Sequence, residues 1–180
     1  MMGSKKMTVY IPVGVSGSGK STLWRTKYPD SELLEADLIR KEVGGDISCL
    51  DNEPIVWRIF EERYRKLLKS GKDIYLSEMH LSLKGIKSEL RTILEVNPDY
   101  NVKILLLTVS NHPEICEERV ANDLKNGVER STTAGIKAKN GSPLIEDMSR
   151  RWKILVNSQE FKDTIDYFTK LGLDIEVIEV

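Results

Sequence analysis

Apolar and polar positions alternate along the 180-residue chain in two rhythms, and these rhythms predict the fold. Continuous apolar runs typical of buried strands alternate with segments of helical spacing, as in βαβ units with a parallel sheet. The expected strands are Met7–Val13, a short strand around Leu33 and Leu34, Asp73–Ser77, Val102–Ser110 and Asp174–Val180. We therefore predict an α/β fold of the P-loop NTPase type, with a five-stranded parallel sheet, helices on both faces and a helical lid.

Helices are expected where apolar residues recur at three- and four-residue spacing. The clearest case is Glu53–Ser70, which Gly71 ends as a C-cap. The other expected helices are Ser21–Lys27, Pro113 to about Asn126, Leu144–Asn157 and Ser158–Leu171. Residues 127–143 lack apolar periodicity and are rich in small polar residues. We therefore expect a single domain over residues 1–180, with a lid at about 119–143.

Composition narrows the possible function classes. The hydrophobic fraction of 40% and charged fraction of 31% are typical of a folded globular chain. The two cysteines form neither a disulfide framework nor a metal clip, and neither a signal peptide nor a membrane-length apolar run is found, so we expect a cytoplasmic protein without a membrane role. A net charge of −1 argues against coating long nucleic acid, although it allows binding of a strand end.

The segment Gly14–Ser21 matches the phosphate-binding pattern GxxxxGK[ST], directly between an expected strand and an expected helix. Glycines let the backbone wrap phosphate oxygens, while loop amides and the helix N-terminus supply positive potential. Lys20 would contact the β and γ phosphates of ATP, and the Ser21 hydroxyl would bind Mg²⁺. The alternative is a flexible glycine- and serine-rich turn. The expected nucleotide-binding residues are Gly14, Ser16, Gly17, Ser18, Gly19, Lys20, Ser21 and Thr22.

The strongest candidates on the side of the phosphate acceptor are Asp37 and Arg40. Asp37 follows the second expected strand, at the carboxyl edge where open α/β sheets bind ligands. Asp37 could accept the proton of an attacking hydroxyl, and Arg40, three residues on, could hold a neighbouring phosphate. The alternative interpretation is a helix N-cap followed by a solvated arginine.

Glu78 follows the third expected strand, where a carboxylate can orient water on Mg²⁺ beside the phosphate loop. An ordinary exposed strand-end acid is the alternative. Met79 and His80 could line the acceptor pocket, but His80 has no second ligand or acid partner in the sequence pattern, so we interpret it as structural.

Three basic residues around the lid are candidates for stabilising charge on the transferred group: Arg119, Lys125 and Arg130. Each could equally be a solvated helix charge. Between residues 119 and 153 there are eight Lys or Arg and four Asp or Glu, so this region is locally basic. The tryptophans Trp24, Trp57 and Trp152 are expected in the core or a groove, because their spacing does not indicate a base-stacking platform.

At these residues the chain resembles the polynucleotide 5′-hydroxyl kinases of bacteriophage and bacterial RNA repair, within the P-loop kinases. The resemblance covers most of the chain, from the loop at Gly14 through Asp37, Arg40 and Glu78 to residues 143–152. It implies that Asp37 is the general base for a 5′-hydroxyl, that Arg40 contacts acceptor phosphate, and that lid arginines stabilise the transition state. It also implies a cytoplasmic enzyme. If a phage encodes the protein, the resemblance implies that it acts in the cytoplasm of the host cell.

Two departures from that family keep the acceptor open. Its strand-end acid is usually followed by Thr and Asn, whereas Glu78 is followed by Met79 and His80. Its second lid arginine would fall near Asn126, so Lys125 or Arg130 would have to replace it. The leading hypothesis is phosphorylation of a 5′-hydroxyl end of DNA or RNA. The alternatives are a kinase for a nucleoside-like small molecule or a hydroxymethylated base in DNA, and a regulatory module that binds ATP without transferring phosphate.

Overall fold

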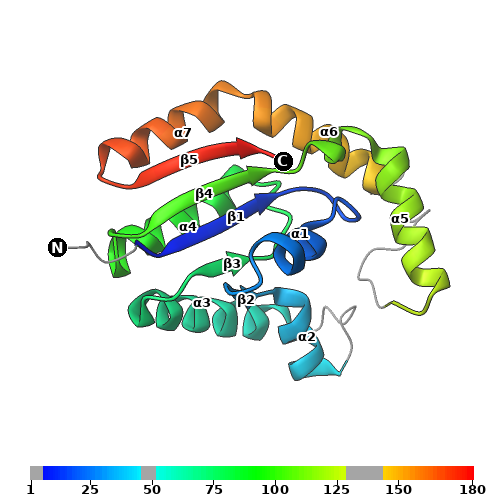
Figure 1. Cartoon of the computed structure of the whole chain (residues 1–180), viewed down its shortest axis with the longest axis horizontal. Coiled ribbons are helices and arrows are strands. Elements are labelled where there is room, and N and C mark those ends of the chain that lie inside the picture. The colour runs from blue at the N-terminus through cyan, green and yellow to red at the C-terminus, as the bar shows by residue number, and fades with distance from the viewer. Residues whose placement is uncertain (1–5, 46–51, 129–143) are drawn as a thin grey trace.

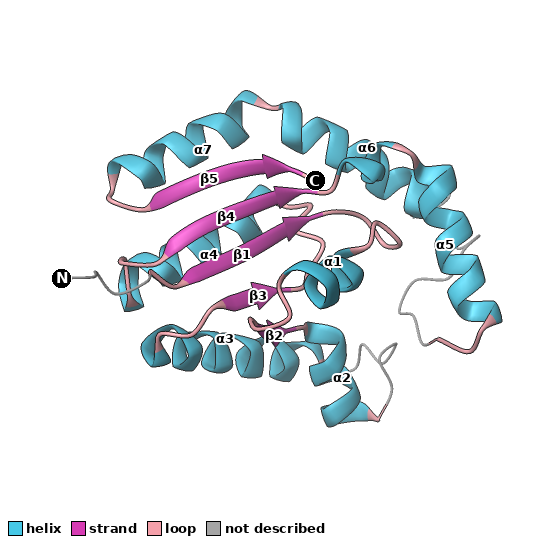
Figure 2. Ribbon diagram, in the orientation of Figure 1, coloured by secondary structure: helices cyan, strands magenta, loops and turns pink. Residues whose placement is uncertain are grey.

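The computed structural model describes residues 6–45, 52–128 and 144–180. Its centre is a five-stranded sheet in the order β2-β3-β1-β4-β5, and every pairing is parallel (Figures 1 and 2). In register, Val9 of β1 lies opposite Ile74 of β3 and Val102 of β4. The predicted parallel sheet is therefore confirmed. The strands are β1 (Thr8–Val13), β2 (Glu32–Leu34), β3 (Ile74–Leu76), β4 (Asn101–Leu106) and β5 (Asp174–Glu179).

Helices cover both faces of the sheet, but unequally. The α helices are α1 (Lys20–Lys27), α2 (Ala36–Gly44), α3 (Glu53–Ser70), α4 (Leu83–Val96), α5 (Pro113–Lys125), α6 (Leu144–Asn157) and α7 (Gln159–Lys170). Residues of α3, α4, α6 and α7 join the larger hydrophobic cluster, whereas α1 supplies Leu23 and Trp24 to a smaller one. The strand arrowheads point toward the end of the molecule where α1, α2 and α5 gather (Figure 1).

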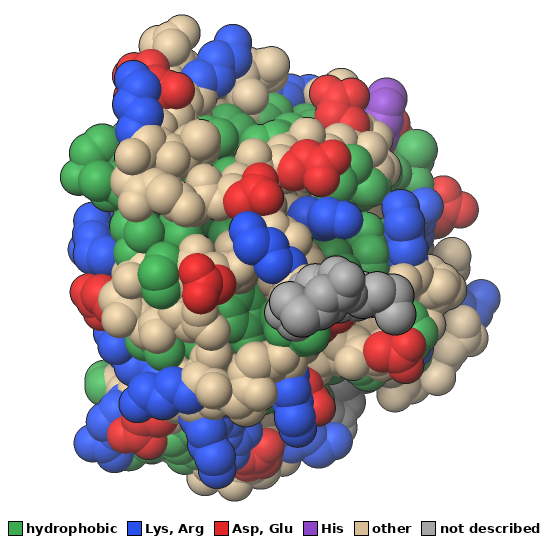
Figure 3. Space-filling model, turned by 60° about the vertical axis from the view of Figure 1, so that its left-hand side comes forward, with side chains coloured by type: hydrophobic (Ala, Val, Ile, Leu, Met, Phe, Trp, Pro, Cys, Tyr) green, Lys and Arg blue, Asp and Glu red, His purple; other side chains and the backbone are tan. Residues whose placement is uncertain are grey.

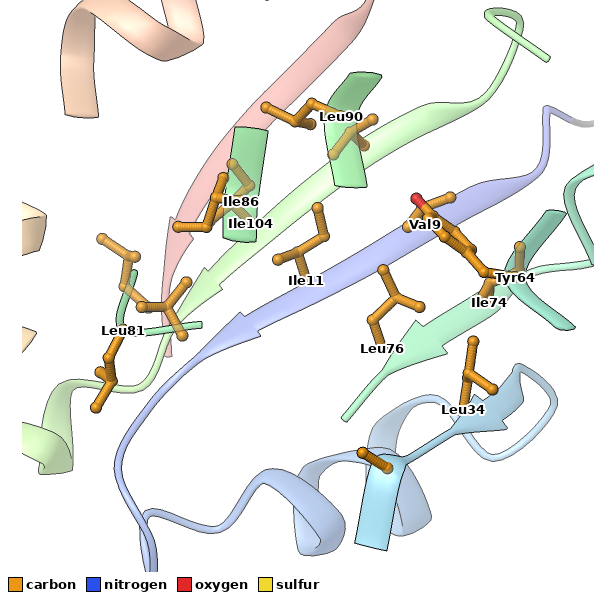
Figure 4. Packing of buried hydrophobic residues seen from close by; sticks show 14 of the residues in the cluster. Val9, Ile11, Leu34, Tyr64, Ile74, Leu76, Leu81, Ile86, Leu90 and Ile104 are labelled. Carbon is orange, nitrogen blue, oxygen red and sulfur yellow. The ribbon is translucent and has the colours of Figure 1, made fainter. Parts of the chain in front are cut away.

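The two-residue period of the strands explains the two clusters. In β1, Val9, Ile11 and Val13 face the larger cluster, while Tyr10 between them packs into the smaller one. Figure 4 shows Ile11 beside Ile104 and Leu76, with Tyr64 of α3 and Leu90 of α4 among the surrounding side chains. Burial of these apolar surfaces on both faces fixes the strand register, and so fixes where each strand's carboxyl end lies.

Two expectations about the fold need correction. The fourth strand was expected to reach Ser110, but β4 ends at Leu106 and residues Thr108–Asn111 form a 3-10 helix. The apolar run continues past the strand because Leu107 and Val109 still pack into the core, and periodicity alone does not detect that turn. Helix α4 was not among the expected helices, although Ile86, Leu90 and Ile93 repeat on its buried face.

On the face shown in Figure 3, acidic and basic side chains are interspersed among exposed apolar ones. Across residues 6–45, 52–128 and 144–180, no helix combines the length and apolar character needed to cross a membrane.

Candidate active site

The loop between β1 and α1 has a backbone that requires glycine. Gly17 and Gly19 have φ angles of 78° and 94°, in the left-handed region that other residues avoid. A Cβ atom on Gly17 would also lie 2.4 Å from the carbonyl oxygen of Cys116 on α5. One on Gly14 would lie 2.4 Å from Ser18 Oγ. The loop therefore packs against α5 at a distance that only glycine permits, and forms the compact cradle that the sequence pattern predicts.

Residues far along the chain form hydrogen bonds that hold this loop and the end of β1 in place. The Val15 amide donates to Ser110 Oγ at 3.1 Å, and Ser149 Oγ donates to the Ser110 carbonyl at 2.6 Å. The Trp152 indole donates to the carbonyl of Val13, the last residue of β1, at 2.9 Å. Sequence reasoning missed Ser110 and Ser149, because single serines and a buried tryptophan carry no motif signal and become neighbours only in the folded sheet.

The donor-side residues suit a triphosphate and a magnesium ion. Lys20 Nζ lies over the loop, donating to the carbonyls of Gly14 at 3.1 Å and Val15 at 2.8 Å. Ser21 and Thr22 are exposed in the first turn of α1. The buried Ser18 hydroxyl oxygen has no hydrogen-bond partner among the described residues and lies beside Gly14 within the loop. The glycine cradle, the ammonium group and the exposed hydroxyls together fit this ligand.

The turn after β3, within residues 77–82, connects the phosphate loop to helix α2 through hydrogen bonds. Glu78 Oε1 accepts the backbone N–H of Ala36 at 2.6 Å, and thereby caps the N-terminus of α2. The next residue, Met79, accepts the Gly14 N–H at 3.0 Å through its carbonyl. One turn therefore positions both the loop and the helix that carries Asp37. Burial raises the pKa of Glu78 to about 7, against the lowering effects of the Ala36 N–H and of His80.

His80 anchors this turn within the protein. It is the only residue other than glycine in the described part of the chain with a positive φ, 54°. Its Nδ1 lies 2.6 Å from the Pro12 carbonyl oxygen, and Nε2 lies 2.7 Å from Glu89 Oε2. Burial opposes a charge on His80, but the Glu89 carboxylate and the Pro12 carbonyl raise its pKa overall. The histidine interpreted as structural thus has an acid partner, Glu89 on α4.

Asp37 and Arg40 share a cluster with a third residue that the sequence pattern did not indicate. Arg40 Nη1 lies 2.5 Å from Asp37 Oδ1, while Nε and Nη2 contact both oxygens of Glu53 at 2.7 and 3.1 Å. The hydrogen bonds that Arg40 donates to Glu53 raise the pKa of Arg40 still further, and the same bonds lower the pKa of Glu53. Glu53 begins α3, thirteen residues after Arg40, so no local spacing links it to Asp37.

The three lid candidates differ in position. Arg119 lies on α5, and its Nη1 donates to the Gly17 carbonyl at 3.3 Å. Lys125 lies in the exposed last turn of the same helix. Arg130 and most of the expected lid, residues 129–143, lie outside the described residues. Of the two candidates that the structure describes, Arg119 is the one with a hydrogen bond to the phosphate loop.

A cavity of about 380 Å³ lies near the edge strand β2, between α2 and α3. Its lining includes Leu33, Leu38, Arg63 and Lys66, and it contains no residue of the phosphate loop. The phosphate loop, Asp37 and Glu78 lie instead at the carboxyl edge of the sheet, where open α/β sheets bind ligands.

Comparison with known proteins agrees with this architecture. The profile of a family described as AAA domain matches residues 9–139. A presumed kinase from Chloroflexus aurantiacus J-10-fl has a similar structure, with a TM-score of 0.60 and 13% identity, over 82% of this chain and 80% of that chain. A chain of the Pnkp1/Rnl/Hen1 RNA repair complex gives a TM-score of 0.64 at 18% identity, over 89% of this chain and 47% of that one. No curated protein matches the sequence.

This chain spans about half the length of the matched chain in the RNA repair complex. At these identities the likenesses show the fold alone, which is an α/β fold of the P-loop NTPase type. Because the family profile covers well over half of the 180 residues, the chain belongs to the AAA domain family.

Proposed function

We propose that this protein is a kinase that transfers the γ-phosphoryl group of ATP to a hydroxyl group, with the 5′-hydroxyl end of DNA or RNA as its leading acceptor. The observation that carries the proposal is the shared turn after β3. Met79 holds the phosphate loop, while Glu78 caps the helix of Asp37. The turn after β3 thus positions both the phosphate loop and the Asp37 carboxylate at the carboxyl edge of the sheet.

On the donor side, Lys20 and the amides of the glycine loop hold the β and γ phosphates. Ser21 contributes a hydroxyl to the magnesium site. Glu78 remains a candidate for orienting a water on that ion, because the Ala36 N–H occupies only Oε1 of its carboxylate. Bound Mg²⁺ would supply charge compensation along the triphosphate.

On the acceptor side, Asp37 accepts the proton of the attacking hydroxyl. The hydroxyl oxygen forms a bond to the γ phosphorus, the bond from that phosphorus to the β,γ-bridging oxygen breaks, and ADP leaves. Arg40 orients the Asp37 carboxylate through their ion pair. The guanidinium has five N–H groups, and three of them donate to Asp37 and Glu53. The other two N–H groups are available to an acceptor phosphate. Arg119, beside Gly17, is the leading candidate for stabilising charge on the transferred group.

One observation favours a second candidate, a nucleoside-like acceptor without a phosphate at this point. Arg40 is already paired with Asp37 and with Glu53. Two carboxylates and one guanidinium leave this cluster with a net negative charge, which disfavours a further anion beside it. A neutral sugar hydroxyl approaches Asp37 without that repulsion.

The test offers γ-labelled ATP and Mg²⁺ with three acceptors in parallel: 5′-hydroxyl oligonucleotides, nucleosides, and duplex DNA with hydroxymethylated bases. Label on oligonucleotide 5′ ends is the expected result, and Asp37→Asn should abolish it while ATP binding remains. Label only on nucleosides or bases would replace the leading acceptor with the alternative. ATP binding with no transfer to any acceptor, and no effect of Asp37→Asn, would instead support a nucleotide-gated regulatory module.

A further inference from the structure

Trp57 on α3 is exposed in a way that the other tryptophans are not. Its side chain is 42% exposed, whereas Trp152 is buried and donates to the Val13 carbonyl beneath the phosphate loop. Trp24 is half-buried and donates to the Ser31 carbonyl. Trp57 is therefore not a core residue, and it offers a large aromatic surface to solvent.

The Trp57 ring is held in one orientation by its neighbours. Its Nε1 donates to Glu53 Oε2 at 3.0 Å, one turn earlier on the same helix. The ring of Phe60 lies 5.3 Å away, centroid to centroid, tilted by 56°. The guanidinium carbon of Arg40 lies 5.8 Å from the ring centroid, within the range of a cation–π contact. An exposed ring fixed by three contacts loses little conformational entropy when a ligand binds.

These contacts also place the ring close to the proposed base. Arg40 contacts Asp37 at 2.5 Å, and the same guanidinium neighbours the Trp57 ring. An acceptor whose hydroxyl points at Asp37 can therefore extend past Arg40 and place an attached ring on Trp57. Glu53 completes the arrangement, because it binds Arg40 with both oxygens and the indole N–H with one of them.

We propose that Trp57 is a stacking platform for the nucleobase of the phosphate acceptor. This inference rests on the proposed transfer to a hydroxyl and specifies the acceptor as one that carries a base. A base suits the site because it is planar, uncharged and presents a π face, whereas the net negative charge of Asp37, Arg40 and Glu53 disfavours an anionic group here. Stacking on an aromatic residue tolerates any base, so Trp57 would confer preference for a base without selecting its identity.

Kinetics with matched acceptors test the platform. One oligonucleotide carries an ordinary 5′-terminal nucleotide with a free 5′-hydroxyl, and the other is abasic at that nucleotide. For a small acceptor, the pair is a nucleoside and the corresponding methyl riboside. In the unaltered protein, the abasic acceptor should have a KM about 5- to 150-fold higher, the range that loss of one base stack gives.

Variants then assign this preference to one residue. Trp57→Ala should abolish the KM difference between the base-bearing and the abasic acceptor, because KM for the base-bearing acceptor rises more than KM for the abasic one. Trp57→Phe should keep most of the preference, because phenylalanine retains a π face. Tyr167→Ala, which removes an aromatic ring that is 59% exposed on α7, is the matched control and should change none of these values. An unchanged preference in Trp57→Ala would overturn the platform.

A binding measurement separates this inference from the reaction itself. Adenosine or a 5′-hydroxyl oligonucleotide should quench tryptophan emission in the unaltered protein, but much less in Trp57→Phe, which keeps Trp24 and Trp152. Quenching that depends on Trp57 without phosphate transfer to any acceptor would overturn the proposed kinase and leave the platform standing. Phosphate transfer without Trp57-dependent quenching or base preference would overturn the platform and leave the proposed kinase standing.

Discussion

The Glu78 side chain reaches from the end of β3 to the backbone nitrogen of Ala36, 2.6 Å away. The helix that begins at Ala36 carries Asp37 in its first turn, so a strand-end carboxylate sets the position of the proposed base. In the structure the side chain of Glu35, at the N-cap position, makes no capping hydrogen bond, and Glu78 supplies this function from the turn after β3.

Substitutions at Glu78 should separate this capping role from a role at the magnesium site. Glu78→Ala removes the acceptor for the Ala36 N–H and should lower the free energy of unfolding by about 1 kcal/mol. Glu78→Gln keeps an acceptor oxygen and should cost less stability, but it removes the charge and should raise the Mg²⁺ concentration needed for half-maximal activity. Denaturant unfolding and Mg²⁺ titrations measure the two effects. An unchanged Mg²⁺ requirement in Glu78→Gln would show that Glu78 caps α2 but has no role at the magnesium site.

The pH dependence of stability should also change in Glu78→Gln. Burial raises the pKa of Glu78 from 4.5 to about 7, so between these values the folded state holds a proton that the unfolded state has released. Protonated Glu78 therefore contributes stability that is fully present below pH 4.5 and is lost as the pH rises through 7. Glutamine does not titrate. The free energy of unfolding of Glu78→Gln, measured relative to the unaltered protein by denaturant titration, should rise across this window and then level off. Parallel curves for the two proteins would contradict the shifted pKa.

Gly17→Ala should damage the phosphate loop through two separate effects. The φ of 78° disfavours any side chain, and the new Cβ would meet the Cys116 carbonyl at 2.4 Å. Together these should cost roughly 2–4 kcal/mol of folding stability and weaken ATP binding. Gly71→Ala is the matched control, because Gly71 also has a positive φ of 71° but no atom within 4 Å of the added Cβ. Thermal unfolding and ATP titration of both variants check this. Equal losses in the two variants would show that contact with α5 contributes nothing.

The sequence was sufficient to predict the features that depend on local spacing. The five parallel strands follow from apolar runs, and the loop at Gly14 follows from a motif that needs glycine at positive φ. Asp37 could also be placed at the carboxyl edge, because strand order in an open α/β sheet brings the strand ends together. Their placement required no knowledge of side-chain packing.

The remaining parts of the candidate site depend on contacts between residues far apart in sequence. Glu53 approaches Arg40 only because α3 packs against α2, and Ser110 meets Val15 across ninety-five positions. Glu89 lies on α4, a helix absent from the predicted elements, so the acid partner of His80 was not foreseen. Single polar residues such as these produce no periodic signal. Only the packing of helices on the sheet determines which of them meet.

Arg119 should contribute more to phosphate transfer than Lys125, although both are basic residues on α5. Arg119 contacts the Gly17 carbonyl at 3.3 Å, whereas Lys125 lies six residues later, roughly 9 Å farther along the helix axis. If Arg119 stabilises charge on the transferred group, Arg119→Ala should lower kcat on the order of a thousandfold. Lys125→Ala should stay within about threefold, as expected for a solvated surface charge. Single-turnover rates at saturating ATP isolate the chemical step from binding, and unfolding curves show whether loss of the Gly17 contact alone disturbs the loop. A larger loss of kcat in Lys125→Ala than in Arg119→Ala would assign stabilisation of the transferred group to Lys125. The contact between Arg119 and the Gly17 carbonyl would then be structural.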